Sequence, residues 1–582
     1  MTAGDDGQSA AVSFRDFSFK YASQTEPTLF GINLAIQRGE KILIAGPSGC
    51  GKSTLAHAIN GLIPNAFPGT AGGTLHISGR EAFTQDVFTR SQTVGTVLQD
   101  TDGQFVGLSA AEDIAFAAEN NCVPQDEMRA RVREAAALAR IDTHLAKSPY
   151  NLSGGQKQRV SLAGLLVCDV DILLFDEPLA NLDPATGEAA IELIDWLHRS
   201  TGKTVIIIEH RLEDVLHKSV DRVVVMRAGR IAACAPPAAI LSGTVLGECG
   251  LREPLYLAAL KTAGAGIAAD GCESVETVTF DSDALRSFYA GAEDEPPPPA
   301  RKRILTAENI GFRYADDSGA EAAGSAALDG ISFNIQEGEM IAIAGANGAG
   351  KSTLAKLIAG FITPQTGKLY FQDENMAPLS IRERSARIGC VMQNPNQMIS
   401  FPMVFDEAAF ALRNAGLDEA VVCAGVYEAL TVCGLHPFRN WPVSALSYGQ
   451  KKRLTIASIL VTRPRVLLLD EPTAGQDFRH YTAIMEFLRA LNRENGLTVV
   501  MITHDMHLML EYTSRAFVLA GGRLLCCAPA SEVLTRDELI REASLKKTSL
   551  YTLARRAGLE DAQGFIRRFM YAERRRRTEE AL

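Results

Sequence analysis

The chain contains the stretch IAGPSGCGKSTLAHAINGLI at residues 44–63, and nearly the same stretch, IAGANGAGKSTLAKLIAGFI, recurs at residues 343–362. In each of them a short apolar run leads into a glycine-rich turn, which is followed by apolar residues at helical spacing. A strand, a glycine loop and a helix in this order are the context in which the pattern G-x-x-x-x-G-K-S binds phosphate groups. The two stretches therefore predict two phosphate-binding loops in one chain.

The chemistry of such a loop depends on its backbone and on one lysine. The glycines let consecutive N–H groups turn inward around phosphates, and the following helix adds partial positive charge. We expect Lys52 and Lys351 to contact the β and γ phosphates of ATP, and Ser53 and Ser352 to bind Mg²⁺. The predicted nucleotide-binding residues of the loops are Gly46, Pro47, Ser48, Gly49, Cys50, Gly51, Lys52, Ser53, Thr54, Gly345, Ala346, Asn347, Gly348, Ala349, Gly350, Lys351, Ser352 and Thr353.

The repeat extends far beyond these loops. FSFKYAS recurs as IGFRYAD, VGTVLQD as IGCVMQN, and LSGGQKQRVSLAGLL as LSYGQKKRLTIASIL. Four pairs of residues are each 294 positions apart, namely Gln99 and Gln393, Ser153 and Ser447, Asp176 and Asp470, and His210 and His504. A long-period repeat changes the domain count. The sequence therefore predicts two domains of the same kind.

A pair of acidic residues ends an apolar run in each copy, in VDILLFDEP at 170–178 and in RVLLLDEP at 465–472. Such runs suit strands that are buried on both faces, and their carboxyl ends face the ligand crevice of an open α/β sheet. We expect Asp176 and Asp470 to hold Mg²⁺ through its water shell. Glu177 and Glu471 are predicted to polarise the attacking water.

Composition limits the other functions of the chain. It has 582 residues, too many for one hydrophobic core, and its net charge of −11 and pI near 5.6 argue against a general nucleic-acid binder. The basic run Arg574–Arg577 is predicted to be a solvated helix end or tail rather than a contact with nucleic acid or anionic lipid. The eleven cysteines show no metal-ligand spacing and are typical of reduced thiols in a cytosolic protein. No apolar run is long enough to span a membrane, so we expect any membrane role to come through partners.

The domain boundaries follow from the repeat and from a proline-rich, acidic stretch, GAEDEPPPPARKR, in which Pro296 to Pro299 favour an extended conformation. We expect a first domain at 1–245, a linker at 246–300, a second domain at 301–530 and a C-terminal helical extension at 531–582.

With these motifs the chain resembles the ABC ATPases over residues 10–240 and 303–530. The signature of that family stands at residues 152–156 as LSGGQ and at 446–450 as LSYGQ. The resemblance implies an α/β fold of two tandem P-loop NTPase (RecA-like) domains. Each domain is expected to carry an antiparallel β subdomain, and a helical subdomain at about 104–165 or 397–460.

The resemblance also assigns roles to single residues. Tyr21 and Tyr314 are expected to stack on adenine, Gln99 and Gln393 to sense the γ-phosphate and Mg²⁺, and His210 and His504 to be switch histidines. Asp183 and Asp477 match an aspartate in the loop after the acidic pair. The signature residues are Ser153, Gly154, Gly155, Gln156, Ser447, Tyr448, Gly449 and Gln450.

In this family two modules face head to tail, so that each ATP lies between the phosphate loop of one module and the signature of the other. One chain with two modules is therefore expected to form both sites. Tyr448 departs from the family pattern, which has glycine at this position. Since Ser447 and Gly449 remain, as do both glutamates and both histidines, we predict two competent sites.

The segments after the two glutamines, QDTDGQFVGLSAAEDIAF at 99–116 and QNPNQMISFPMVFDEAAF at 393–410, look like the energy-coupling-factor importers, and so does EHRLEDV at 209–215. This resemblance implies a transmembrane scaffold subunit and a small substrate-binding membrane subunit as partners, with the chain at the cytoplasmic face of the plasma membrane. A sugar-type importer ATPase and a ribosome-associated ABC factor are the alternatives. The latter is expected to carry a long basic linker, which this chain lacks.

Overall fold

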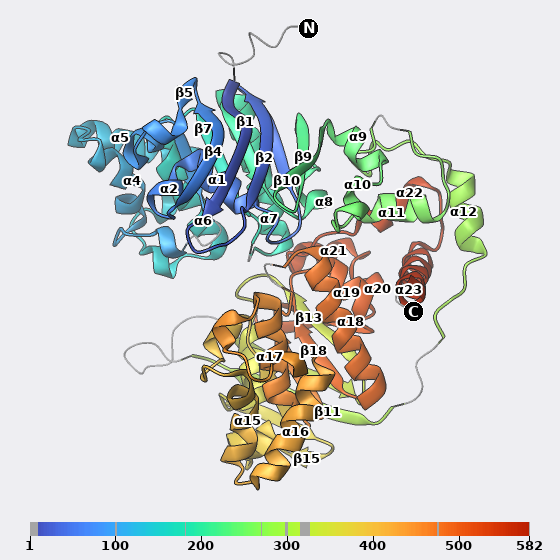
Figure 1. Ribbon diagram of the computed structural model, residues 1–582. Helices are drawn as coiled ribbons and strands as arrows, with labels where there is room; N and C mark the ends of the chain where they lie inside the picture. The colour runs from blue at the N-terminus through green and yellow to red at the C-terminus, as the bar shows by residue number, and fades with distance from the viewer. Residues whose placement is uncertain are drawn as a thin grey trace. The chain divides into compact units, whose positions relative to one another are not determined.

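The computed structural model describes residues 10–98, 102–180, 182–268, 271–296, 301–314, 326–473 and 476–580. The chain forms two compact units (Figure 1), of which unit 1 comprises Met1–Leu285 with Asp477–Arg479 and unit 2 comprises Arg286–Gln476 with His480–Leu582. None of the helices in the described ranges is long and apolar enough to cross a bilayer.

Unit 1 contains ten described strands and a larger set of helices. Its strands are β1 (Ala10–Tyr21), β2 (Leu29–Gln37), β3 (Lys41–Ala45), β4 (Gly69–Ile77), β5 (Arg80–Glu81), β6 (Val94–Val97), β7 (Ile172–Asp176), β8 (Thr204–Ile208), β9 (Arg222–Arg227) and β10 (Arg230–Ala235). Its α-helices are α1 (Lys52–Asn60), α2 (Leu62–Asn65), α3 (Val87–Ser91), α4 (Ala110–Asn120), α5 (Gln125–Leu138), α6 (Gly154–Leu166), α7 (Pro184–Thr201), α8 (Leu212–Val215), α9 (Pro237–Ser242), α10 (Val245–Glu248) and α11 (Leu255–Thr262). Helix α12 (Ser282–Ala290) crosses the boundary of the two units, and so does the start of α18 (Phe478–Asn495), whose first two residues are assigned to unit 1.

Unit 2 repeats this order of elements and adds helices at its end. Its strands are β11 (Arg303–Phe312), β12 (Leu328–Gln336), β13 (Met340–Gly345), β14 (Thr366–Phe371), β15 (Glu374–Asn375), β16 (Ile388–Val391), β17 (Val466–Asp470), β18 (Thr498–Ile502), β19 (Arg515–Ala520) and β20 (Arg523–Ala528). Its α-helices are α13 (Lys351–Ala359), α14 (Ile381–Ser385), α15 (Val404–Asn414), α16 (Glu419–Val432), α17 (Tyr448–Leu460), α18 (Phe478–Asn495), α19 (Met506–Tyr512), α20 (Ala530–Val533), α21 (Asp537–Glu542), α22 (Ser549–Arg556) and α23 (Ala562–Glu580).

Each unit is built on two sheets of the same topology. In unit 1 an antiparallel sheet has the order β2-β1-β4-β5, and a six-stranded sheet has the order β10-β9-β3-β8-β7-β6. In the second of these, β9, β3, β8, β7 and β6 are parallel and only β10 is antiparallel. Unit 2 has the equivalent orders β12-β11-β14-β15 and β16-β17-β18-β13-β19-β20. Central strands such as β3 and β8 are buried along their whole length, as their continuous apolar runs predict.

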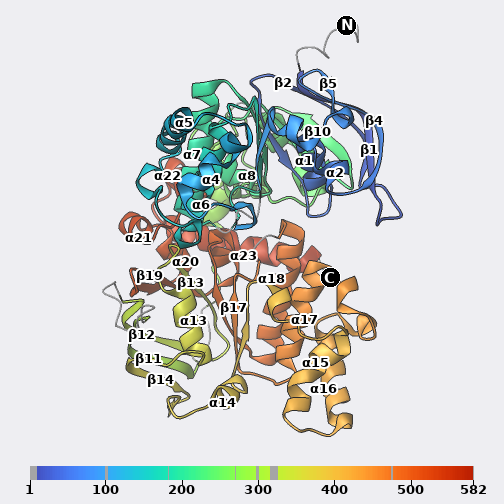
Figure 2. The same ribbon diagram turned by 90° about the vertical axis from the view of Figure 1, so that its left-hand side faces the viewer.

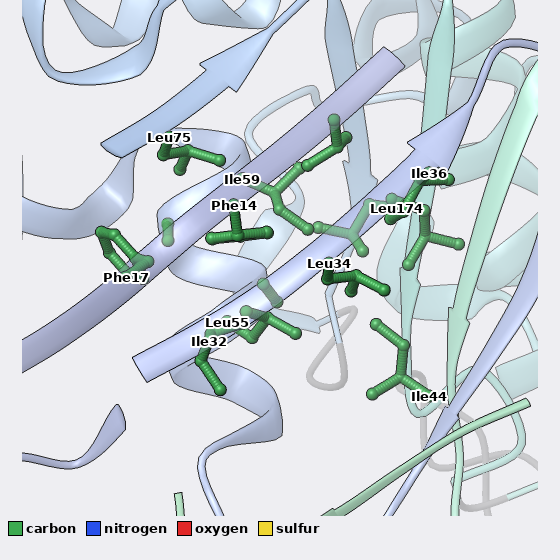
Figure 3. Close-up of a cluster of buried hydrophobic side chains, with 14 of the residues drawn as sticks. Phe14, Phe17, Ile32, Leu34, Ile36, Ile44, Leu55, Ile59, Leu75 and Leu174 are labelled. Atoms are coloured by element: carbon green, nitrogen blue, oxygen red, sulfur yellow. The ribbon is translucent and has the colours of Figure 1, made fainter. Parts of the chain in front are cut away.

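The helix after the first glycine loop, α1, packs in the core between the two sheets of unit 1. Figure 3 shows its side chains Leu55 and Ile59 within one buried cluster. The same cluster takes residues from the antiparallel sheet and from the parallel sheet, namely Phe14, Phe17, Ile32, Leu34, Ile36, Leu75, Ile44 and Leu174. Helix α13 takes the same place in the core of unit 2. Packing on both sides fixes the direction in which each glycine loop opens.

A group of three helices lies beside each parallel sheet, at the positions where a helical subdomain was expected. Helices α4, α5 and α6 contact one another in unit 1, and α15, α16 and α17 do so in unit 2. Figure 2 shows the second group together at one side of its unit. The last helix of each group begins with the signature residues.

The C-terminal extension packs on unit 2, and the basic run is not merely solvated. Helix α23 contacts α19, α20 and α22. Arg574 and Arg575 pair with Glu295 and Glu293 of the acidic stretch at distances of 2.5 and 2.6 Å. Arg577 lies 3.4 Å from the buried carboxylate of Glu511 in α19. The sequence could not reveal these partners because they lie about 65 to 280 positions away. Residues 297–300 of the proline-rich stretch lie outside the described residues.

A buried arginine closes the C-terminal end of α1. Arg90 of α3 is almost fully buried, and its guanidinium donates to the carbonyl oxygens of Ile59 (2.9 Å), Ala58 (3.4 Å) and Ala82. Burial lowers its pKa to about 10. Arg384 of α14 donates to equivalent carbonyls in unit 2. Carbonyls at a helix C-terminus otherwise lack partners, so this side chain stabilises the end of the helix.

We predict that Arg90→Leu destabilises unit 1, because several buried carbonyl oxygens lose their donor. The expected loss is about 1–3 kcal/mol in the free energy of unfolding, measured by urea denaturation. Arg80→Leu, at an exposed position of β5, is the matched control and should change the stability by less than about 0.5 kcal/mol. Equal effects of the two substitutions would contradict the role given to Arg90.

Candidate active site

The lysines of both glycine loops fold back onto their own loops. Lys52 Nζ donates to the carbonyl oxygens of Gly46 (2.7 Å) and Pro47 (3.0 Å). Lys351 Nζ donates to the equivalent carbonyls in unit 2, at 2.9 and 2.8 Å. Each ammonium group is thereby held at the mouth of a ring of backbone groups, where an incoming phosphate oxygen can replace a carbonyl.

One glycine in each loop is required by its backbone conformation. Gly51 and Gly350 precede α1 and α13 with φ of 102° and 101°, in the left-handed region that other residues rarely adopt. A Cβ at Gly51 would also lie 2.6 Å from the Leu29 side chain, and one at Gly350 would lie 2.5 Å from the Ala327 carbonyl oxygen. Only glycine therefore allows the loop to pass this close to its neighbours and still enter the helix.

The two predicted adenine-stacking tyrosines lie beside the first turns of these helices. The Tyr21 hydroxyl is 3.0 Å from Thr54 Oγ1, and the Tyr314 hydroxyl is 3.3 Å from Thr353 Oγ1. Each ring also meets edge-on the phenylalanine two residues before it, with centroids 5.0 Å apart. Each tyrosine is thus brought next to the phosphate loop of its own unit.

The acidic pairs stand at the carboxyl ends of β7 and β17, one strand away from the loops. Asp176 pairs with Ile208 of β8, which also pairs with Ile44 directly before the first loop. The next residue, Glu177, has φ of 48°, and Glu471 has φ of 45°. A left-handed conformation at a glutamate costs about 1–3 kcal/mol and is characteristic of functional sites. Both units keep it at the same position.

Burial raises the pKa of these carboxyl groups. The pKa of Asp176 rises to about 6 and that of Glu177 to about 7, in both cases chiefly through burial, with the charge of Glu209 adding to it. In unit 2 burial raises the pKa of Glu471 to about 8 and also raises that of Asp470. Asp176 Oδ1 and Glu471 Oε1 have no hydrogen-bond partner among the described residues. Asp176 Oδ1 is thus left without a donor from the described part of the protein, whereas Glu471 Oε1 faces the ring of His504.

The predicted switch histidines follow the neighbouring strands and reach the glutamates. His504 Nε2 lies 3.5 Å from Glu471 Oε1. In unit 1 it is Nδ1 of His210 that lies 3.9 Å from Glu177 Oε1, and the same nitrogen is 3.1 Å from Glu209 Oε1. The two sites thus bring the same residue types together but present different ring nitrogens to the glutamate.

Each signature sequence forms the first turn of a helix. Ser153 accepts from the backbone N–H of Gln156, and Gln156 Oε1 accepts from the N–H of Ser153, at 3.4 and 3.0 Å. Ser447 and Gln450 form the same reciprocal pair at the start of α17. This capping box leaves the N–H groups of the glycine positions, Gly154, Gly155 and Gly449, at a helix N-terminus, where they favour an anion.

Tyr448, which stands where the first signature has Gly154, contacts its own unit. The Tyr448 hydroxyl lies 3.5 Å from the Gln393 carbonyl oxygen, to which Lys452 Nζ also donates at 2.8 Å. Gln393, a predicted metal ligand, is thereby held near the signature helix by its backbone. The equivalent Gln99 of the first copy lies outside the described residues.

Sequence reasoning missed the buried acid Glu209 and the role of Asp183. Asp183 is buried and caps α7, accepting from the N–H of Thr186 at 3.0 Å. Glu209 directly precedes His210 and is fully buried. The available signal was that Thr503 stands at its place in the second copy, a difference within an otherwise matched series.

Comparison with known proteins shows the family to which this architecture belongs. A family model described as ABC transporter matches residues 29–180 and 328–474. The chain belongs to the ABC transporter ATPases. A second model, described as ATP-binding cassette cobalt transporter, matches residues 243–312, and one described as an AAA domain matches residues 439–511.

Relatives of this ABC ATPase match along its whole length. Proteins named "Putative ABC transporter ATP-binding protein" are 49% identical in Vibrio parahaemolyticus, over 98% of both chains, and 50% identical in Clostridium perfringens, over 97% of this chain and 99% of the other. A solved structure of cbiO1 from Clostridium perfringens, described as part of the ABC transporter complex cbiONQ, is 33% identical. It covers 46% of this chain and 100% of its own, with a TM-score of 0.38.

The predicted fold and activity are confirmed at the level of the family. The chain is an ABC-type ATPase with two tandem α/β domains, each with an antiparallel sheet and helices. The roles of the single site residues and the predicted division of the chain at 245, 300 and 530 stay predictions.

We predict that this ABC ATPase needs both glutamates. Glu177→Gln and Glu471→Gln should each lower steady-state ATP hydrolysis by about 100-fold while ATP binding persists, because the amide cannot take a proton from water. Phosphate release and binding of a fluorescent ATP analogue measure the two quantities. Full turnover in either variant would show that its site does not contribute.

The raised pKa of Glu471 also predicts a pH effect on stability. Between about pH 5 and pH 8 the folded state keeps a proton that the unfolded state has released, so the free energy of unfolding falls as pH rises. Glu471→Gln removes this pH-dependent loss of stability, because the amide does not titrate. Without nucleotide or Mg²⁺ its melting temperature should exceed that of the native chain by about 2 °C or more at pH 8 and equal it at pH 5. A difference that is the same at both pH values would refute this origin.

Proposed function

We propose that this chain is the ATP-hydrolysing subunit of an energy-coupling-factor importer, which powers the uptake of a vitamin, a vitamin precursor or a metal ion through separate membrane subunits. The observation that carries the proposal is the match of residues 243–312 to the model described as ATP-binding cassette cobalt transporter. Most of this segment lies between the two repeats, and it ends with the first strand of the second one. It therefore points to a class of transporter and not only to the ATPase activity.

Exposed apolar side chains near the start of the helical groups support a membrane partner. Phe116 on α4 and Phe410 on α15 occupy equivalent positions, and they are 46% and 45% exposed. Leu108, in the segment before α4, is 84% exposed, and Trp441 lies open beside the start of α15, where its carbonyl oxygen accepts from the N–H of Val404. Exposed large apolar residues on and beside these helices favour a protein contact. We expect a helix of the scaffold subunit to bind here in each unit.

Buried or capping carboxylates give these segments a fixed shape. Glu407 is buried, and its Oε2 accepts from the N–H groups of Ser400 and Phe401 at 2.8 and 2.9 Å. In unit 1 Glu112 accepts from the N–H groups of Leu108 and Ser109. The loops are thus preformed, so that a partner can bind without first ordering them.

The residues at the strand ends fit ATP with Mg²⁺. Mg²⁺ prefers a few oxygen ligands together with waters and phosphate oxygens. Asp176 offers a carboxylate oxygen without a hydrogen-bond partner in the described part of the chain, and Ser53 stands in the first turn of α1 beside Lys52. Asp470 and Ser352 hold the same places in unit 2. We propose that these side chains hold the ion, which would neutralise charge on the β and γ phosphates.

The mechanism assigns each remaining side chain one task. Lys52 and Lys351 leave their own loop carbonyls and bind phosphate oxygens, while the loop N–H groups hold the rest of the phosphate chain. Glu177 and Glu471 hold the attacking water and take its proton. We propose that the modules pair head to tail, close on two ATP molecules and reopen after hydrolysis. The motion would pass to the membrane partner through residues 101–116 and 395–410.

Co-expression with the membrane proteins encoded beside it tests the proposal. The chain should co-purify in detergent with a polytopic scaffold and a small substrate-binding membrane protein, and the complex should take up substrate into vesicles in an ATP-dependent manner. Capture of a sugar permease pair with an external binding protein would favour the sugar-type importer instead. Nucleotide-dependent co-sedimentation with ribosomes would refute any importer.

We predict that Leu108→Asp and Phe410→Asp abolish uptake while ATP hydrolysis by the isolated chain stays within about twofold of the native rate. The carboxylates would have to be buried against the partner, whereas the free chain leaves them in water. Ile381→Asp, at an exposed position of α14, is the matched control and should leave uptake intact. Loss of uptake in the control alone would place the contact elsewhere.

A further inference from the structure

The first unit carries a buried carboxylate that the second unit replaces by a hydroxyl. Glu209 follows β8 directly and is 0% exposed. Its backbone N–H continues the sheet by donating to the carbonyl oxygen of Ile44 at 3.1 Å. The carboxylate therefore starts from a rigid strand end, next to the switch histidine and one strand away from the acidic pair. Thr503 is the equivalent residue of unit 2.

Both oxygens of Glu209 are occupied by neighbouring donors. Oε1 accepts from the backbone N–H groups of His210 and Arg211 at 2.8 and 3.2 Å, and Nδ1 of the His210 ring lies 3.1 Å from the same oxygen. Oε2 accepts from the N–H of Leu179 at 3.3 Å. A carboxylate without water is costly unless donors surround it. This set of donors lets the charge stay in the interior and fixes its position.

Glu209 and Arg211 bind the backbone N–H and the backbone carbonyl oxygen of one residue, Leu179, in the neighbouring loop. Glu209 takes the N–H of Leu179, and the Arg211 guanidinium donates to the Leu179 carbonyl oxygen. Leu179 is fixed in turn because its side chain is buried. It comes two positions after Glu177, in the segment that leads to Asp183. The histidine loop and the segment after the catalytic glutamate are thus joined by two backbone contacts.

The second unit builds the same loop from other contacts. Thr503 Oγ1 accepts from the N–H of Asp505 at 3.0 Å, and Asp505 Oδ1 accepts from the N–H groups of His507 and Leu508. These bonds stay within the loop and the first turn of α19. There it is Nε2 of His504 that faces the catalytic glutamate. The difference in ring orientation between the units therefore coincides with the exchange of glutamate for threonine.

We propose that Glu209 is a positioning residue for ATP hydrolysis in the first unit: it holds Nδ1 of His210, so that Nε2 is the nitrogen left to meet the nucleotide, and it ties the histidine loop to the segment after Glu177. The inference rests on the proposed role of His210 as a switch histidine. A carboxylate 3.1 Å from one imidazole nitrogen favours one orientation of the ring and thereby sets the task of the other nitrogen. Unit 2 has Thr503 at this position, so the two sites of one chain differ in how their histidine is held.

The test is a double-mutant cycle on the full chain. Glu209→Gln keeps the shape but replaces one acceptor oxygen by an N–H₂ group that faces donors. It should lower kcat by about tenfold or more with KM for ATP within about twofold. In a His210→Ala background the same substitution should cost clearly less, because the ring that it positions is gone and only its contact with Leu179 remains. Glu192→Gln, an exposed carboxylate of α7, is the control and should leave kcat unchanged.

The outcomes separate the inference from the function on which it rests. Unchanged kcat in Glu209→Gln, or a loss that adds in full to that of His210→Ala, would overturn the positioning role while leaving the histidine assignment intact. Unchanged kcat in His210→Ala would overturn both. Should Glu209→Gln fold poorly, ¹⁵N spectra of the histidine rings give a second readout. The ring signals that disappear in His210→Ala should shift in Glu209→Asp, and their staying in place would contradict the contact with Nδ1.

Discussion

The register of three neighbouring parallel strands is the constraint on which each site depends. In unit 1 Ile208 of β8 pairs with Ile44 of β3 on one side and with Asp176 of β7 on the other. In unit 2 Ile502 of β18 pairs in the same way with Ile343 and Asp470. Parallel strands end at the same edge of a sheet. The glycine loop, the acidic pair and the histidine are therefore neighbours, although the loop lies more than 100 residues before the other two in sequence.

The cost of this arrangement is visible in the carboxyl groups. Glu177 and Glu471 combine a left-handed backbone with burial that raises their pKa to about 7 and about 8. Neither property stabilises the fold. The strands and α1 are held by extensive apolar burial on both faces, which offsets these local costs. Stability and function thus draw on different residues, since the core supplies the former and the strand ends the latter.

The sequence predicted the architecture because the relevant signals are local. Glycine loops, apolar runs that end in acids, and the signature sequences each require only neighbouring residues, and the repeat doubled every signal. The partners of Arg574 and the contacts of Glu209 with Leu179 could not be predicted, because they join residues that only the tertiary fold brings together. The role of Arg90 could not be predicted for the same reason: nothing in the neighbouring sequence shows that its guanidinium is buried against α1.

The comparison of the two units also changes the meaning of their differences. Equal topology and equal active-site residue types would suggest two interchangeable sites, with Tyr448 as an isolated departure. Yet Tyr448 lies against the same Gln393 carbonyl that Lys452 binds, and Lys452 replaces the uncharged Gln158 of the first copy. Glu209 and Arg211 form a matched pair in unit 1, just as Thr503 and Asp505 do in unit 2. Substitutions that occur in contacting sets preserve local bonding, so the two units are better understood as two solutions to one task than as an intact copy and a decayed one.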